Sequence, residues 1–257
     1  MSLDLVRVPA GRNEVAVLAY GPRRARGVGI VLAHGYSSSK QNLDALAVFL
    51  ASHGFAIWSL DFPGHKLGAS GGRLENAEDL TDAMLAVARY AREHGASTLY
   101  AAGHSLGAAT ALMSAGRDAS FAGAISVATG LGRPSVLDAF SERSVDLRSQ
   151  YVDGLALPRL FEQIEPLLRE ALPKLAGRPQ LYVAAERDMM VTVASARALF
   201  EAAPEPKAFV TISSDHTFAG ENARGSILAW LNERHPRVEQ SVAAAPAAAT
   251  QGRSPSA

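Results

Sequence analysis

The chain has 257 residues, of which 48% are hydrophobic and 19% are charged, and its formal net charge is zero. This composition is typical of a globular protein and argues against a disordered chain or a membrane protein. The zero net charge creates no field that would attract nucleic acid or anionic lipid, so we expect neither as a partner. The chain has no cysteine, which excludes disulfides, thiolate metal sites and a cysteine nucleophile.

The N-terminal region predicts an opening β-hairpin, because two extended segments, 3–8 and 14–19, flank the turn sequence PAGRN. These first residues alternate in polarity and carry early charges, with no apolar run like that of a signal peptide. We therefore expect a cytoplasmic protein. No stretch reaches the roughly 18 apolar residues of a membrane-spanning helix.

Strand and helix patterns alternate from residue 28 onward. The run VGIVLA is apolar at every position and rich in β-branched residues, as in a strand buried on both faces. Further strands are predicted at 55–60, 98–102, 122–128, 180–185 and 208–213, and helices at 40–54, at 74–95, after residue 105, at 195–202 and in a last segment reaching Trp230. This alternation predicts an α/β fold with a mostly parallel sheet and helices on both faces.

The alternation is interrupted between Gly130 and Gly177, where helical patterns occur without a convincing strand over a length that is unusual for a loop. We expect one domain over 1–237 with a small helical insertion at about 131–177. Its apolar side chains either contact a ligand or pack the insertion onto the sheet: Leu137, Phe140, Leu155, Leu157, Leu160 and Phe161. Residues 238–257 are rich in Ala, Pro and Ser, and we expect a disordered tail.

Two segments, GASGG around Ser70 and GHSLG around Ser105, match the pattern Gly-x-Ser-x-Gly. A catalytic serine in this pattern requires a strand that leads into a tight turn and then a helix. Ser105 has both, because a predicted strand precedes it and an Ala-rich helix follows. Ser70 follows a Pro/Gly loop with no strand, so we interpret it as a loop residue near the pocket whose replacement by Ala leaves most activity intact.

A serine nucleophile needs a histidine base and a carboxylate that orients the histidine. Beyond the ends of two later strands the chain carries Asp188 and His216, in the order Ser, Asp, His that such a sheet requires. Glu186 and Asp215 are alternative carboxylates near the same strand ends, and Asp188 is preferred. The other six histidines lie at helix ends, in the Pro/Gly loop, after the first buried strand or within the serine motif.

The oxyanion of an acyl-transfer intermediate is stabilised by backbone N–H groups. One donor is expected from the residue after the nucleophile, Leu106, and the other from the loop AHGYSSSK. In that loop Gly35 permits a sharp turn, and the N–H of Tyr36 is the second predicted donor. An ordinary strand-ending His-Gly turn is the alternative interpretation.

These motifs, in this order, resemble the α/β-hydrolase family over about residues 10–235. HGY resembles the family's oxyanion loop, DFPGH its Asp-x-Pro-Gly-His loop, GHSLG its nucleophile turn, and ERD and DHTF its acid and histidine turns. The resemblance implies Ser105, Asp188 and His216 as a catalytic triad and the insertion as a cap over the pocket. Within the family the chain looks similar to small bacterial serine esterases, including cinnamoyl-esterase-like and monoglyceride-lipase-like members. Lys66 departs from the Gly common at its position.

The function expected from these residues is hydrolysis of carboxylic esters of small to medium apolar or aryl acyl groups. No cofactor or metal is expected, and the partner is a small-molecule ester. A thioesterase, an amidase or peptidase, or an acyltransferase would use the same three residues, and a non-catalytic member of the fold would use the pocket to bind a ligand. Oligomeric state, acyl-chain preference and physiological substrate have no signal in the sequence.

Overall fold

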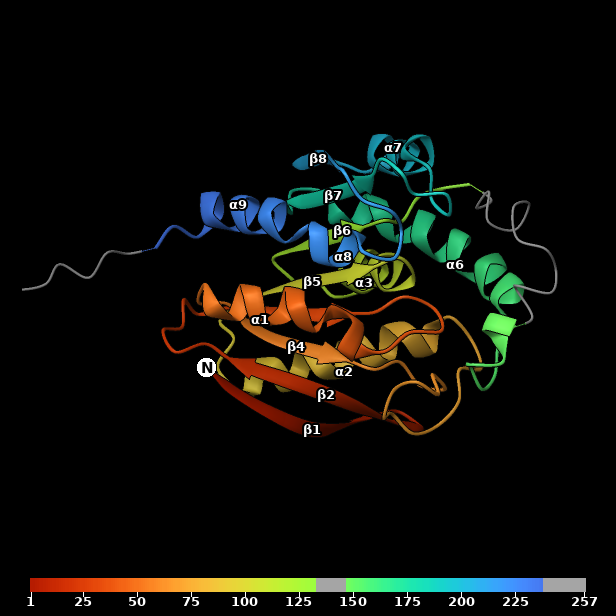
Figure 1. The fold of residues 1–257 in the computed structure, drawn as a ribbon, viewed down its shortest axis with the longest axis horizontal. Helices are drawn as coiled ribbons and strands as arrows, with labels where there is room; N and C mark the ends of the chain where they lie inside the picture. Colours follow the sequence, from red (N-terminus) through yellow and green to blue (C-terminus); the bar gives the residue numbers. More distant parts are fainter. Residues whose placement is uncertain (133–146, 238–257) are drawn as a thin grey trace, which may run out of the picture.

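The computed structural model describes residues 1–132 and 147–237. Within them eight strands form one sheet: β1 (Ser2–Ala10), β2 (Asn13–Gly21), β3 (Val28–Ala33), β4 (Ala56–Leu60), β5 (Thr98–His104), β6 (Gly123–Val127), β7 (Gln180–Ala185) and β8 (Lys207–Ile212). Their spatial order is β1-β2-β4-β3-β5-β6-β7-β8, so that β1 and β8 lie at opposite edges (Figure 1). The hairpin β1–β2 and the pair β2–β4 are antiparallel, and all other neighbours are parallel. The predicted α/β fold with a mostly parallel sheet is confirmed.

Helices cover both faces of this sheet. The described helices are α1 (Asp44–Ser52), α2 (Glu78–Glu93), α3 (Leu106–Arg117), α6 (Leu157–Ala171), α7 (Val193–Ala202), α8 (Ala219–Asn222) and α9 (Arg224–Arg234), with 3-10 turns η1 (Lys40–Leu43) and η2 (Leu172–Leu175). Side chains alternate along β3: Ile30 and Leu32 pack in the cluster with α1 and α9, whereas Val31 and Ala33 pack in the cluster with α2, α3 and α7. Because helices cover both faces of the sheet at β3, its sequence VGIVLA is apolar at every position.

Two predicted helices differ from the structure at their N-terminal ends. The segment predicted over 40–54 divides into η1 and α1, and the helix predicted from residue 74 begins at Glu78. The backbone of Leu74 is instead paired with the insertion, because its N–H donates to Asp153 and its carbonyl accepts from Leu155. This pairing with a distant segment overrides the local helical pattern.

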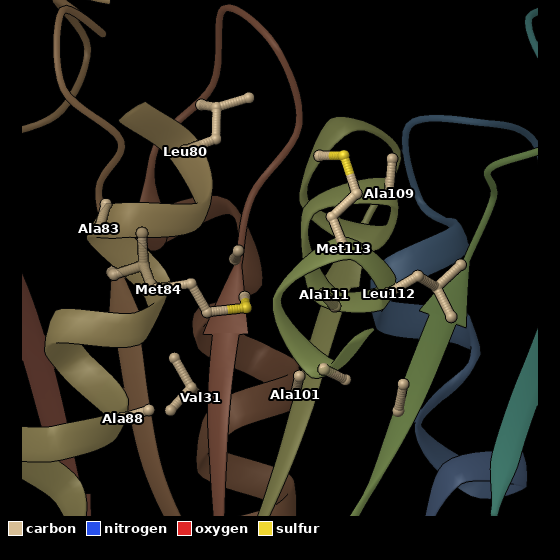
Figure 2. Close-up of a cluster of buried hydrophobic side chains, with 14 of the residues drawn as sticks. Val31, Leu80, Ala83, Met84, Ala88, Ala101, Ala109, Ala111, Leu112 and Met113 are labelled. Carbon is tan, nitrogen blue, oxygen red and sulfur yellow. The ribbon is translucent and has the colours of Figure 1, made fainter. Parts of the chain in front are cut away.

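Helix α3 lies very close to the sheet. Figure 2 shows Ala111 of α3 and Met84 of α2 beside Val31 of β3 and Ala101 of β5. At the N-terminal end of α3 the approach is closest, since a Cβ added to Gly107 would lie 2.7 Å from the carbonyl oxygen of His34 and closer still to that of Ala33. Only glycine fits at this position, and this is the structural reason for the last residue of GHSLG.

The described part of the insertion contains α6 and η2, and α6 packs beside α3 (Figure 1). Leu160, Ile164 and Leu168 of α6 are buried in the same core cluster as α3. Residues 133–146 and 238–257 lie outside the described residues, and with them Leu137, Phe140 and the C-terminal tail. The domain bounds and the disorder of the tail stay predictions.

The close approach of α3 predicts a large effect of one methyl group. We expect Gly107→Ala to lower the free energy of unfolding by about 1–3 kcal/mol, because backbone atoms of β3 must move to admit the methyl. Gly225→Ala is the matched control: Gly225 also lies near the start of a helix, and an added Cβ there contacts nothing. The control should be neutral or stabilising by up to about 1 kcal/mol. Urea unfolding measures both, and equal effects would contradict the packing argument.

Candidate active site

Ser105 occupies a strained turn between β5 and α3. Its backbone is in an unusual positive-φ conformation, with φ 55° and ψ −116°. The turn is held because the Ser105 N–H donates to the carbonyl of Val127 at the end of β6, at 2.8 Å. A non-glycine residue with positive φ is uncommon and clusters at functional sites. The turn places the serine side chain in a cavity at the carboxyl ends of the strands.

The side chains of Ser105, His216 and Asp188 form a continuous hydrogen-bonded chain. The Ser105 Oγ lies 3.0 Å from His216 Nε2, and His216 Nδ1 lies 2.7 Å from Asp188 Oδ2. The second carboxylate oxygen of Asp188 accepts the N–H groups of Met190 and Val191, each at 2.7 Å. Both oxygens of this buried carboxylate are therefore bound, which fixes its orientation toward the imidazole.

The rival carboxylates are used differently. Glu186 is exposed at the surface, and Asp215 accepts the N–H of Phe218 at 3.0 Å, closing a turn. Among the described residues, the carboxylate bound to the His216 ring is Asp188. The folded chain thus brings together the three residues that the sequence selected and keeps the two alternatives apart from the imidazole.

His104, the second residue of GHSLG, holds the loop that carries His216. Its Nε2 donates to the His216 carbonyl at 2.7 Å, and the two rings lie 4.9 Å apart. Burial, and then the nearby His216, lower the pKa of His104 to about 4. The sequence placed His104 only within the serine motif, since a bond to a residue more than a hundred positions away has no local signal.

The predicted oxyanion donors, Tyr36 and Leu106, both line the cavity with Ser105. In the described part of the chain, neither backbone N–H is donated to another protein atom. The Gly35 carbonyl, which belongs to the same peptide unit as the Tyr36 N–H, accepts from His34 Nδ1 at 2.7 Å. The other ring nitrogen, His34 Nε2, accepts the N–H of Phe62 at 3.0 Å. Neutral His34 therefore fixes this peptide unit against the neighbouring loop.

A buried ion pair between Lys40 and Asp61 closes the far end of the same loop. The Asp61 carboxylate also accepts the N–H groups of Lys40 and Ala69, each at 2.7 Å. Burial raises the pKa of Asp61, but the hydrogen bonds from Lys40 and Ala69 outweigh it, and the pKa is lowered. The sequence did not single out this pair, because a lysine at the start of a helix resembles a surface residue.

The cavity has a volume of about 520 Å³ and two chemically distinct regions. Its inner wall is apolar and buried, formed by Leu106 and Ala109 of α3 and by Leu157, Ile164 and Leu168 of α6. Its mouth is more polar and exposed, with Asn42, Thr217 and Glu162.

Only part of the predicted apolar set reaches the cavity. Leu157 and Phe161 line it, whereas Leu160 is completely buried in the core and Leu155 packs against the core. The sequence missed Ile164 and Leu168, which also line the cavity. Helical periodicity marks an apolar face but does not tell which of its residues meet a neighbour and which meet a space.

Ser70 does not line the cavity among the residues described. Its hydroxyl accepts the N–H of Ala16 at 2.8 Å and donates to the carbonyl of Asp61 at 2.7 Å. Through these two hydrogen bonds, Ser70 of the second Gly-x-Ser-x-Gly segment links the loop after β4 to strand β2.

The chain belongs to the alpha/beta hydrolase family, because residues 30–253 match that family's model. Solved structures share the fold at low identity. An alpha-beta serine hydrolase homologue from Coxiella burnetii has 21% identity and TM-score 0.66, covering 90% of this chain and 98% of that one. Est1E from Butyrivibrio proteoclasticus with bound ferulic acid has 18% identity and TM-score 0.68, covering 89% of this chain and 98% of that one. The alpha/beta hydrolase GrgF from Penicillium sp. sh18 has 14% identity and TM-score 0.73, covering 91% of this chain and 99% of that one.

No curated protein matches the sequence significantly. Among the residues 1–132 and 147–237, no helix combines the length and the apolar character needed to cross a membrane.

Three histidines in and around the site predict a loss of stability in mild acid. Burial lowers the pKa of His34 and of His104 to about 4 and that of His65 to about 3. The unfolded chain takes up these protons near pH 6.5, and the folded chain does so only at a much lower pH. Stability is therefore complete above about pH 6.5 and falls as the pH decreases toward 4, by up to about 1.4 kcal/mol per pH unit for each histidine.

Urea unfolding at pH 7, 6 and 5 measures this slope. In His65→Leu the slope should be smaller, because one of the three groups no longer titrates. The exposed His94→Gln is the matched control and should retain the wild-type slope. A wild-type protein equally stable at pH 7 and pH 5 would contradict the prediction.

Proposed function

We propose that the protein is a serine hydrolase that cleaves carboxylic esters through an acyl-enzyme intermediate. The observation that carries the proposal is the hydrogen-bonded chain from Ser105 through His216 to Asp188, at 3.0 and 2.7 Å, in a cavity of the alpha/beta hydrolase fold. A serine hydroxyl becomes nucleophilic when a histidine accepts its proton and a carboxylate orients that histidine. This arrangement meets both requirements.

In the first half of the reaction, Ser105 Oγ attacks the ester carbonyl carbon while His216 Nε2 takes the serine proton. Asp188 holds the Nδ1–H of His216 and stabilises the imidazolium that forms. The negative charge on the carbonyl oxygen is bound by the N–H groups of Tyr36 and Leu106. The intermediate collapses as the imidazolium protonates the leaving alcohol, and the acyl group stays on Ser105.

In the second half, His216 removes a proton from a water molecule that attacks the acyl-enzyme carbonyl. The same two N–H groups stabilise the second oxyanion, and His216 returns the proton to Ser105 as the carboxylic acid leaves. The strained conformation of Ser105 is set before substrate arrives, so the turn needs no rearrangement during the reaction.

The proposed substrates carry small to medium apolar or aryl acyl groups, which suit the apolar inner wall of the cavity. The segment that includes α6 supplies part of this wall, and we propose that it acts as a cap. The neighbour Est1E was solved with ferulic acid bound, so an aryl acid is a reasonable test ligand for this cavity.

Replacement of the two motif serines distinguishes their roles. We expect Ser105→Ala to lower kcat for p-nitrophenyl butyrate by at least about 10⁴-fold, because the nucleophile is lost. Ser70→Ala is the matched control and should keep most activity. A fluorophosphonate probe, which reacts covalently with activated serines, should label wild type and Ser70→Ala but not Ser105→Ala. Labelled or active Ser105→Ala protein would overturn the proposal.

The class of substrate is tested by comparing acyl groups on different leaving atoms. Rates on p-nitrophenyl butyrate, a feruloyl ester, the corresponding butyryl thioester and a butyryl anilide should be highest for the oxygen esters. The anilide should be slowest, because its amine is the poorest leaving group. Activity confined to the thioester or to the anilide would replace the esterase proposal by a thioesterase or an amidase.

A further inference from the structure

Helices α3 and α6 enclose a wedge-shaped space that opens toward Ser105. At the far end the two helices touch: a Cβ added to Gly116 of α3 would lie 2.7 Å from the Cβ of Ala171 of α6. At the near end they are separated by the cavity, which Leu106 of α3 and Phe161 of α6 both line. The helices thus run in the same direction and diverge toward the active-site serine.

The positions along the two helices can be matched from their contact at Gly116 and Ala171. Because both helices rise 1.5 Å per residue, Leu168 lies at about the level of Met113, and Ile164 at about the level of Ala109. Leu168 lines the cavity whereas Met113, which is buried, does not. The cavity therefore ends at Leu168. Figure 2 shows Ala109 and Met113 along α3, one turn apart.

The chemistry of the proposed reaction determines which part of an ester enters this wedge. The leaving oxygen must face His216 Nε2, which protonates it, and the exposed Thr217 adjoins His216 at the mouth of the cavity. The carbonyl oxygen faces the N–H groups of Tyr36 and Leu106.

The acyl chain is the remaining substituent. Two walls are left for it: the one between α3 and α6, and one formed by the segments after β6 and β7. The wall between α3 and α6 is the deeper one, because Ala109 and Leu168 are buried whereas Met190 and Val191 after β7 are only half-buried.

We infer that the wedge between α3 and α6 limits the length of the acyl chain, with Leu168 as its end wall and Ala109 as its side wall. This inference rests on the proposed esterase function and names its substrate class: esters of short to medium linear acids with little restriction on the alcohol. The alcohol side opens to solvent at the polar mouth, so the enzyme selects on the acid and tolerates large alcohols.

The length of the wedge gives the size of the acyl group. Ala109 and Met113 follow Ser105 by four and eight residues, or about 6 and 12 Å along α3. An extended chain advances about 1.2 Å per bond, so these two levels correspond to about five and ten bonds, and the space before Leu168 holds at most about ten carbon atoms. A longer linear acid must push into the contact between α3 and α6, where packing is closest.

Two substitutions with opposite effects test the inference on p-nitrophenyl esters from acetate to palmitate. In Leu168→Ala, which removes the end wall, the ratio of kcat/KM for dodecanoate to that for hexanoate should rise about tenfold or more. In Ala109→Leu, which fills the side of the wedge, the ratio for hexanoate to acetate should fall about tenfold. With the acyl group held as butyrate, exchange of p-nitrophenol for the larger naphthol should change kcat/KM by the same factor in wild type and in both variants, because the alcohol lies outside the wedge.

Leu160→Ala is the matched control, since Leu160 lies on the same helix and is fully buried but does not line the cavity. It should lose stability and keep both ratios within about twofold of wild type. Thermal unfolding and fluorophosphonate labelling of Ser105 show which preparations are folded and count their reactive sites. Folded, labelled Leu168→Ala and Ala109→Leu with unchanged ratios would overturn the inference and leave the esterase proposal standing. A folded wild-type protein that neither labels nor cleaves any ester would overturn both.

Discussion

The close packing of α3 against the parallel sheet is the constraint on which the site depends. β5 must turn directly into α3 within the span of Gly103 to Gly107, and an added Cβ at either glycine would meet backbone atoms at close range. The turn leaves Ser105 at positive φ, tied to the end of β6 by its N–H. The serine is therefore presented by the rigid part of the fold, and its strain is offset by the buried contacts of the whole helix.

Buried polar groups hold the loops around this turn. The Lys40–Asp61 pair and His34 bind the loop between β3 and α1 to the loop after β4, and His104 binds the turn to the His216 loop. Buried ion pairs contribute little net stability compared with apolar packing, but breaking one leaves a charge without a partner at a high cost. These groups act by restricting the loops to one arrangement, at the same edge of the sheet where the cavity lies.

The division of the cavity into an apolar interior and a polar mouth follows from how the insertion returns to the core. α6 packs on α3 at its C-terminal end and separates from it toward Ser105, so one helix contributes both to the core and to the cavity wall. The fold that this chain shares with solved structures of 14–21% identity does not determine which residues form this wall. In the function proposed, substrate selection depends on residues such as Ala109 and Leu168 rather than on the fold that the family shares.

By itself the sequence determined the fold class and the candidate residues, because both are recorded in local patterns. The period of the apolar residues distinguishes strands from helices, and the order of strand, Gly-x-Ser-x-Gly turn and helix distinguishes Ser105 from Ser70. Asp188 and His216 were selected by their places at strand ends, and their chemical roles stay predictions. Only the tertiary structure decided which groups bind the loops and which side chains line the cavity. Lys40, Asp61 and Leu168 resemble ordinary surface or core residues in sequence, and their environment is set by segments far away along the chain.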